Sequence, residues 1–442
     1  MLKLGNIIKK EKSIKEMAKK SKERRINMKI KYFLLFVFLL MIIFPNISFA
    51  KKDRKTTQSL SSIIESFMSM YTYKIGFLRI IPELKIGMYY DSNALSSNIN
   101  EVGDLVMETG PAITEKMALG KWALIKGYQY IGYVYYKDLN NLRNFPHNLS
   151  CSIITGRRTL IISAEAGRSK GIVKPTTEAD IPVNQLLHYY RASVKFPLFH
   201  KFNLELYFNR NEYSFEDYYT YYVKSIDEAL RRKENIYNLE LSEEITSKTR
   251  LIFLTNKEFF NFIFEPVIRD YKGSQFIGGV EISQSAFFSV FIKMGYYKLV
   301  PNNPNYKSFK GFIVNSMLEY NPIEVLKLRF SLLRKPQFSV FYSINDHYVQ
   351  NQLSIDLIFA LTNKQAISLG TLIGRNEYAN QKFLLNEQKI EDNYKEARIS
   401  YIYKLRKDLY LDNGVSYFKR DSNFEFFVRK RFMFFINLKY SF

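Results

Sequence analysis

The last residues of the chain, "RFMFFINLKYSF" (431–442), alternate in polarity. Bulky apolar side chains occupy every second position, namely Phe432, Phe434, Ile436, Leu438, Tyr440 and Phe442. Arg431, Asn437 and Lys439 lie among the intervening positions. Successive side chains of a β-strand point to opposite faces, so this spacing predicts a strand with one apolar and one polar face. A chain that ends on such a strand raises the question of what covers the apolar face.

The same alternation recurs along the chain from about residue 75. It is clearest in "ELKIGMYY" (83–90), "FSVFIKMGYY" (288–297), "VLKLRFSLL" (325–333) and "QLSIDLIFAL" (352–361). A sustained period of two indicates β-strands. Helical periodicity is confined to "LSSIIESFM" (60–68). The sequence therefore predicts an all-β fold after residue 75.

The links between these segments alternate in length. Short links are expected at 156–159, 197–201, 247–249, 321–324, 362–365 and 405–408, and longer polar links at 92–103, 137–146, 170–185, 214–234, 261–273, 300–307, 337–348 and 378–393. Short periplasmic turns and longer extracellular loops are typical of transmembrane barrels. We therefore expect a transmembrane antiparallel up-and-down β-barrel of about 18 strands, with about 16 as the alternative count. The first strand is expected near residue 82 and the last near 424.

The composition agrees with a barrel. Phe (37) and Tyr (33) bring the aromatic share to 16%, which can supply a lipid-facing band and its aromatic girdles. The mean hydropathy of −0.21 excludes a helical membrane protein of this size. Because lipid cannot hydrogen-bond to the backbone, spanning strands must pair with one another and close into a cylinder.

The N-terminal part has the pattern of a secretory signal. In residues 28–50, Lys29 and Lys31 precede an apolar run that Pro45 ends, and Ala50 precedes the expected cleavage point. A membrane anchor is the rival interpretation, but the run is shorter than the about 20 residues that a spanning helix needs. We expect four parts, which are an untranslated basic extension (1–27), a cleaved signal peptide (28–50), a periplasmic segment (51–74) and the barrel (75–442).

Charge, cysteine and histidine content exclude several classes of protein. The net charge is +23, but an exported chain is not expected to bind nucleic acid. The single cysteine, Cys151, can form no internal disulfide, and the four histidines lack metal-ligand spacing. We expect no cofactor, no metal site and no enzymatic activity, with an outer-membrane lipid-modifying enzyme as the remote alternative.

The stretch "IGFLRIIPELKIGMYYDSNALSS" (75–97) resembles the start of the family called "putative beta-barrel porin 2". The matching residues are Gly76, Pro82, Tyr90, Asp91 and Asn93, and "GDLVMETGPAITEKMALGKWAL" (103–124) is similar to the family's second strand and turn. The resemblance implies an outer-membrane porin. Some relatives occur together with exopolysaccharide biosynthesis and export systems. The resemblance therefore also implies that components of such a system are candidate partners.

The polar faces of the strands should line the interior of the barrel. The candidate pore-lining residues are Lys126, Tyr128, Arg191, Lys195, Lys327, Arg329, Arg429, Arg431 and Lys439. An excess of positive charge in a passage of low dielectric constant favours anions. The alternative is that these charges pair across strands and fill the lumen.

Two functions follow from this pattern. The first is a porin or channel that passes a polar solute, an anionic one or a polysaccharide, or helps to export it; the second is a non-conducting barrel whose loops at 170–185 and 214–234 bind a surface partner. The expected location is the outer membrane of a Gram-negative bacterium after Sec-dependent export. Expected partners are outer-membrane lipid and lipopolysaccharide, polysaccharide export components, and the barrel assembly machinery, which would read Phe434, Leu438, Tyr440 and Phe442 as its signal.

Overall fold

The computed structural model describes residues 73–97, 101–157, 159–178, 182–199, 201–216, 225–265, 269–283, 287–340, 347–378, 390–406 and 408–441. The strands are β1 (Tyr73–Ile75), β2 (Leu78–Asp91), β3 (Asp104–Leu119), β4 (Ala123–Ile131), β5 (Tyr133–Tyr136), β6 (His147–Arg157), β7 (Leu160–Val173), β8 (Val183–Phe199), β9 (Phe202–Glu216), β10 (Arg232–Glu244), β11 (Thr249–Phe262), β12 (Tyr271–Ile282), β13 (Phe288–Pro301), β14 (Phe309–Ile323), β15 (Leu326–Phe338), β16 (His347–Ala360), β17 (Gln365–Tyr378), β18 (Asp392–Arg406), β19 (Leu409–Ser422) and β20 (Arg429–Ser441). Short helices are η1 (Asn140–Leu142), α3 (Ile226–Leu230) and η2 (Glu425–Phe427). The expected parts 1–27 and 28–50, residues 51–72 and Phe442 lie outside the described residues.

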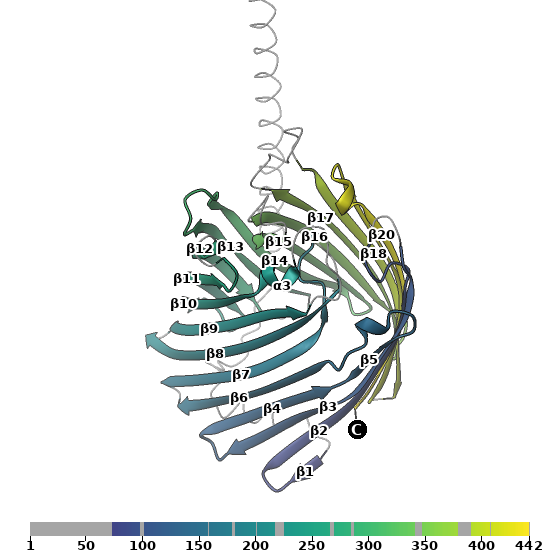
Figure 1. Cartoon of the computed structure of the whole chain (residues 1–442). Coiled ribbons are helices and arrows are strands. Elements are labelled where there is room, and N and C mark those ends of the chain that lie inside the picture. The colour runs from purple at the N-terminus through teal and green to yellow at the C-terminus, as the bar shows by residue number, and fades with distance from the viewer. Residues whose placement is uncertain are drawn as a thin grey trace, which may run out of the picture. The chain divides into compact units, whose positions relative to one another are not determined.

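The strands form one closed antiparallel barrel (Figure 1). Each strand pairs with the next along the chain, and β2 also pairs with β20, from Glu83↔Ser441 to Asp91↔Met433. β4 and β5 both pair with β3 and act as one interrupted strand, while β1 is a short extra strand on the edge of β2. Among the described residues the barrel therefore has 18 strands, which confirms the predicted architecture and count.

The hairpin links alternate in length around the barrel, as predicted. Short links join β3 to β4 (120–122), β6 to β7 (158–159), β14 to β15 (324–325) and β18 to β19 (407–408), while long links such as 92–103, 217–231 and 379–391 join the other ends. We call the two ends the turn end and the loop end. Transmembrane barrels of bacteria place their short turns in the periplasm and their longer loops outside the cell.

The first and last strands begin at other residues than expected, and each shift has a local cause. β2 begins at Leu78 and runs through Pro82. On this edge β1 pairs with residues 78–80 and β20 pairs from Glu83 onward, so the missing N–H of Pro82 falls in the gap between the two partners. β20 begins at Arg429 because the helix η2 occupies residues 425–427.

The interruption between β4 and β5 coincides with a second proline. Pro111 of β3 faces the gap, because β5 pairs with residues 106–109 and β4 with residues 112–119. A Cβ on Gly110 would overlap the backbone of Ile131 and Gly132, so the chain can approach this closely only where a glycine stands. Proline and glycine therefore mark the place where the ladder is broken.

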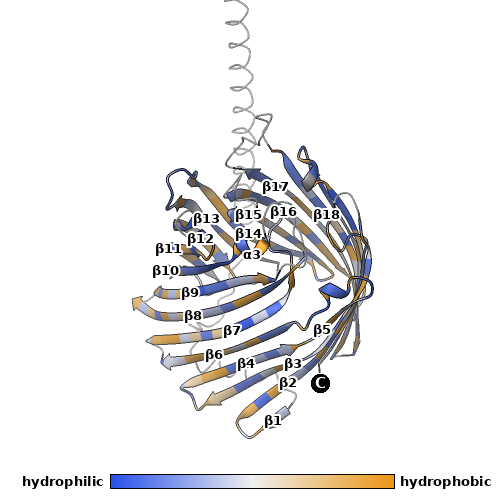
Figure 2. Ribbon diagram, viewed as in Figure 1, coloured by the Kyte–Doolittle hydropathy of each residue, from blue (hydrophilic) through white to orange (hydrophobic). Residues whose placement is uncertain are grey.

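The outward face of the barrel is apolar. On β20, the outward Phe432 and Phe434 are 45% and 42% exposed, whereas Phe435 on the opposite, inward face is 5% exposed. Figure 2 shows the same alternation of hydrophobic and hydrophilic residues along the strands. Leu438 and Tyr440 share the outward face with Phe434, since they are separated from it by even numbers of residues. Their recognition by the assembly machinery stays a prediction.

Within the described part of the chain, no helix is long and apolar enough to cross a membrane.

Candidate channel lumen

The inner face can be followed from strand to strand through the register. Residues directly opposite each other in an antiparallel sheet share a face, and Lys85 lies opposite Gly110 on one side and Lys439 on the other. On this face, contacts form between side chains of strands that are not neighbours in the sheet. Lys85 Nζ donates to Tyr128 Oη (3.0 Å) across β3, and Lys293 Nζ lies 3.4 Å from Glu240 Oε2 across β11 and β12. Such contacts require the concave side of the sheet.

Three of the candidate pore-lining residues lie near the turn end and are ion-paired. Lys327 Nζ lies 2.7 Å from Glu319 Oε2, and Arg329 Nη2 lies 2.6 Å from Glu319 Oε1. Lys439 Nζ lies 3.0 Å from Glu83 Oε1 across the closing pair of strands. These three cations therefore hold the barrel wall together, and their charge is partly neutralised.

Lys126 and Lys195 lie on the same face without such neutralisation. Lys126 stands opposite Lys116, and Lys195 stands opposite Glu205, but no ion pair of Lys126 or Lys195 occurs among the described residues. By contrast, Arg191 Nη1 lies 3.3 Å from a Glu165 oxygen, and its guanidinium stacks on Tyr189 at 4.8 Å. The wall from β2 to β8 thus carries uncompensated positive charge.

Arg429 and Arg431 lie at the loop end. Arg429 is buried and donates from Nη1 to the backbone oxygen of Ser96 (3.2 Å), and Arg431 stacks on Phe418 at 5.4 Å. The nine candidates therefore share the inner face but are distributed along the whole height of the barrel. They do not form one site, and their part in conduction stays a prediction.

A segment at the loop end crosses the interior. Residues 174–178, here called the crossing segment, follow β7 and contact β16 and β17. These two strands lie about half-way round the sheet from β7. Lys174 Nζ donates to Ser96 Oγ (3.0 Å) near the segment's start. At its far end, Thr177 Oγ1 is 3.1 Å from Tyr348 Oη and donates to Asn376 Oδ1 at 3.2 Å. The segment thus links the β2–β3 loop to β16 and β17 inside the barrel.

A cluster of buried polar groups fastens the crossing segment. Glu178 accepts hydrogen bonds from Ser339 Oγ (2.8 Å) and from the backbone N–H of Val340 (2.7 Å). Arg420 donates to both oxygens of Asp392 (2.6 and 2.5 Å) and to the backbone oxygens of Thr177 and Glu178. We call Glu178, Ser339, Asp392 and Arg420 the latch.

The latch is fully desolvated. Glu178, Ser339, Asp392 and Arg420 are all 0% exposed. A buried ion pair adds little net stability, but removing one partner leaves an uncompensated charge and costs about 3–5 kcal/mol. Burial is the main effect on Glu178 and raises the pKa of its carboxyl group to about 7, against the opposing hydrogen bonds of Ser339 and Val340. The crossing segment is therefore held firmly, and its carboxyl group can titrate near neutral pH.

The tip of the β15–β16 hairpin also leaves the wall. β14 and β15 are paired only as far as Val314↔Arg334, so the last residues of β15 pair with β16 alone. Phe338 at this tip packs on Phe260, Phe262 and Tyr271 of the inner face, with ring centroids 5.0–5.3 Å apart. The hairpin tip has turned inward, which brings Ser339 and Val340 to Glu178.

The helix α3 fills part of the same region (Figure 1). Ser225 caps it by accepting the N–H of Glu228 (3.0 Å), and Arg269 donates to the last backbone oxygens, those of Glu228 (2.8 Å) and Ala229. Its buried residues join an apolar cluster with side chains of β8 to β16. The cluster consists of Ile226, Ala229, Leu230, Val183, Phe215, Phe260, Phe262, Tyr271, Tyr297, Leu299, Phe309, Ile313, Phe338 and Val349. The helix α3 and the β15–β16 hairpin tip therefore both narrow the lumen at the loop end.

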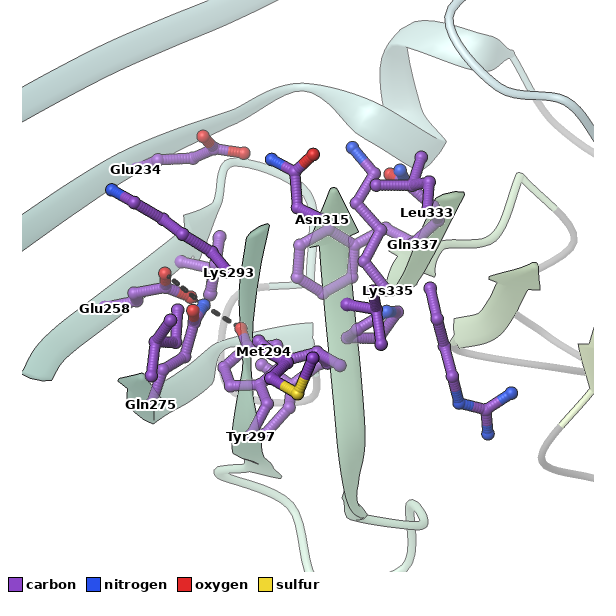
Figure 3. Close-up of a pocket in the computed structure, with 18 of the residues that line it drawn as sticks. Glu234, Glu258, Gln275, Lys293, Met294, Tyr297, Asn315, Leu333, Lys335 and Gln337 are labelled. Atoms are coloured by element: carbon purple, nitrogen blue, oxygen red, sulfur yellow. Dashed lines mark hydrogen bonds between the residues drawn. The ribbon is translucent and has the colours of Figure 1, made fainter. Parts of the chain in front are cut away.

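Beneath this cluster lies a cavity of about 320 Å³ on the wall from β10 to β15. Glu258 accepts hydrogen bonds there from Tyr297 Oη (2.6 Å) and Gln275 Nε2 (2.8 Å). Figure 3 shows the polar ends of Glu234, Asn315 and Lys335 along one side of the cavity. The lining mixes hydrogen-bond donors, acceptors and aromatic rings, which suits a small polar solute.

Sequence reasoning missed the residues that narrow the lumen. Glu178 falls in the expected loop 170–185 and Ser339 in the expected loop 337–348, where no periodicity assigns a direction to a side chain. Asp392 and Arg420 follow the alternation of their strands. These two residues are 28 positions apart, and no pattern in the sequence indicates that they meet each other and the loop residue Glu178.

The family-motif residues organise the first loop. Asp91 Oδ1 accepts the N–H of Asn93 (3.0 Å), and Asn93 Nδ2 donates to the backbone oxygens of Ser97 (2.7 Å) and Lys430 (3.1 Å). Asn93 thereby ties the β2–β3 loop to β20 at the closure of the barrel. Tyr90 lies on the outward face and is 44% exposed.

Among the described residues there is no group of His, Cys, Asp and Glu side chains that could hold a metal ion. Cys151 is an exposed free thiol.

A closed barrel of 18 strands with an apolar outside and a polar inside is the architecture of an outer-membrane porin. Residues 261–442 match the family described as "Putative beta-barrel porin 2", which confirms the predicted resemblance over β12 to β20. The match does not include the motif residues Tyr90, Asp91 and Asn93 from which the resemblance was first drawn.

Solved structures of outer-membrane channels are similar to this chain. Acinetobacter baumannii OccAB2 has a TM-score of 0.50 and 9% sequence identity, over 84% of this chain and 99% of that one. Pseudomonas aeruginosa OpdO has a TM-score of 0.49 and 11% identity, over 82% of this chain and 97% of that one. At such identities the likeness to OccAB2 shows the fold alone. No curated protein sequence matches the chain.

Proposed function

We propose that this porin is a narrow diffusion channel for small polar solutes, with a modest preference for anions. The observation that carries the proposal is the inner face, which bears charged side chains from the turn end to the loop end. The crossing segment, α3 and the β15–β16 tip reduce the lumen at the loop end. A passage of this kind admits small hydrated solutes and hinders polymers.

The anion preference rests on unequal charge neutralisation. Glu319 pairs with Lys327 and Arg329, and Glu83 pairs with Lys439. By contrast, Lys126 and Lys195 have no ion pair among the residues described. An unneutralised cation beside a low-dielectric wall raises the local concentration of anions. We therefore assign the preference to Lys126 and Lys195 in place of the full set of interior cations.

Export of a polysaccharide is the less favoured use of the same barrel. A polymer strand would have to displace the crossing segment, which the buried latch opposes. The proposal includes no catalytic step, and it places the mature chain in a Gram-negative outer membrane after Sec-dependent export.

Ion selectivity tests the proposal in planar bilayers. Reversal potentials in a salt gradient should show anion preference for the unaltered protein, and the variant with Lys126→Gln and Lys195→Gln should lose most of it. The matched control is the variant with Lys121→Gln and Lys201→Gln, which removes the same number of charges at exposed turn-end positions and leaves the inner face unchanged. Cation preference, or an equal effect of both variants, would contradict the assignment, and absence of any conductance would favour the non-conducting barrel.

A further inference from the structure

A row of cations lies on the outward face of the barrel at the loop end. Its exposed members are Lys257, Lys272, Lys298, Lys310, Arg375, Lys395 and Lys430, and Lys419 is half-buried among them. We call these eight residues the outer basic belt. They lie on different strands from β11 to β20, so the belt follows the wall and is not a feature of one loop.

The register places several of these cations side by side. Lys298 is directly opposite Lys310, and Lys419 lies between Lys395 and Lys430 as the direct partner of both. Neighbouring strands are about 4.8 Å apart, so the three lysines form a row about 10 Å wide. Like charges directly opposite each other destabilise a sheet.

The protein supplies little compensation for this repulsion. Lys419 Nζ lies 2.7 Å from Asp421 Oδ1, but Lys298, Lys310, Lys395 and Lys430 form no ion pair among the residues that the structure describes. Glu377, another outward carboxylate at this end, already has a partner, since it lies 3.4 Å from Arg334. The positive charges of several adjacent lysines are therefore left for groups outside the chain to neutralise.

The belt borders the lipid-facing surface. Tyr296 and Phe312 are two residues below Lys298 and Lys310 on the same face, and they are 51% and 50% exposed. Phe432 stands in the same relation to Lys430 and is 45% exposed. Aromatic residues of barrels form girdles at the level of the lipid headgroups. The cations therefore lie at or just beyond the headgroups of the leaflet around the loop end.

We propose that the outer basic belt binds the phosphate groups of the phosphorylated glycolipid that forms this leaflet, lipopolysaccharide. Ammonium groups in a row offer charge-assisted hydrogen bonds to phosphate oxygens, and a lipid with two phosphates can satisfy several lysines at once. Binding relieves the repulsion within each row. It also fixes the depth and orientation of the barrel, independently of whether the lumen conducts.

Lipid binding by the detergent-purified full-length protein tests the belt. The probes are bisphosphorylated lipid A and the same lipid after removal of both phosphates, and the readout is bound lipid counted by native mass spectrometry. The unaltered protein should retain the bisphosphorylated form, and a variant with Lys395→Gln, Lys419→Gln and Lys430→Gln should bind it about tenfold or more weakly. Heat-modifiable migration in gel electrophoresis verifies that the variant is folded.

A matched variant separates the belt from overall charge. Lys121→Gln, Lys201→Gln and Lys364→Gln remove the same number of charges at exposed positions of the turn end. This variant should bind bisphosphorylated lipid A as the unaltered protein does. The proposal is overturned if both variants lose binding equally, if the belt variant keeps its affinity, if dephosphorylated lipid binds as well, or if millimolar inorganic phosphate displaces the lipid.

Discussion

At the scale of single residues, the four buried polar groups of the latch fix the position of the crossing segment in the barrel lumen. Glu178 is a loop residue that becomes fully buried only because Ser339 arrives from a hairpin tip and Arg420 from the far wall. The alternation of polarity predicted which strand residues face inward, and the register agrees with it for Lys126, Arg191 and Arg431. It could not predict the latch, because a period of two says nothing about residues in loops.

The raised pKa of Glu178 makes the latch sensitive to pH. Its carboxyl group has a pKa of about 7 when latched and the ordinary value of 4.5 when released, so the latched state binds the proton more tightly. The latch is then fully favoured below pH 4.5 and weakens as pH rises toward 7, by about 3 kcal/mol in all. We expect the open fraction of single channels to rise over this range in the unaltered protein and to be independent of pH in Glu178→Gln.

Glu101→Gln is the control for this titration, because Glu101 is an exposed carboxylate of another loop at the same end. Its channels should keep the pH dependence. A pH dependence that survives in Glu178→Gln would show that another group titrates.

At the scale of elements, prolines explain where sequence periodicity misplaced a boundary. The first strand was expected to begin near residue 82, yet Pro82 lies inside β2, where one edge of the strand lacks a partner. The inward turn of the β15–β16 tip was not predicted either. Pro336 lies beyond the last β14 partner of β15, in a place where no N–H is needed on that edge, but this is visible only after the register is known.

β20 allows a test of the outward face. Ile436→Arg places a cation toward lipid about half-way along β20 and should destabilise the barrel by about 2–4 kcal/mol. Asn437→Arg adds the same charge to an exposed inward position of the same strand and should be tolerated. The measurement is the fraction of folded protein by heat-modifiable migration over a urea series in lipid vesicles. Equal destabilisation by both variants would mean that the two faces of β20 are not distinguished by lipid.

At the scale of the whole molecule, the architecture was predictable because two independent patterns agree. Alternating polarity fixes strands, and alternating link length separates a turn end from a loop end, so a closed barrel of about 18 strands follows. The state of the lumen was not predictable. It depends on contacts such as Thr177 with Tyr348, which join residues 171 positions apart and leave no local trace in the sequence.

The central claim is that a water-filled lumen is narrowed by the crossing segment. Single-channel conductance in planar bilayers of the unaltered protein, of Glu178→Lys and of the control Glu101→Lys tests it most directly. Glu178→Lys brings a cation against buried Arg420 and should release the segment, which raises the unit conductance by about twofold or more, while the control keeps the small steps of the unaltered protein. Equal conductance of Glu178→Lys and the unaltered protein, or no conductance from any of the three, would contradict the claim.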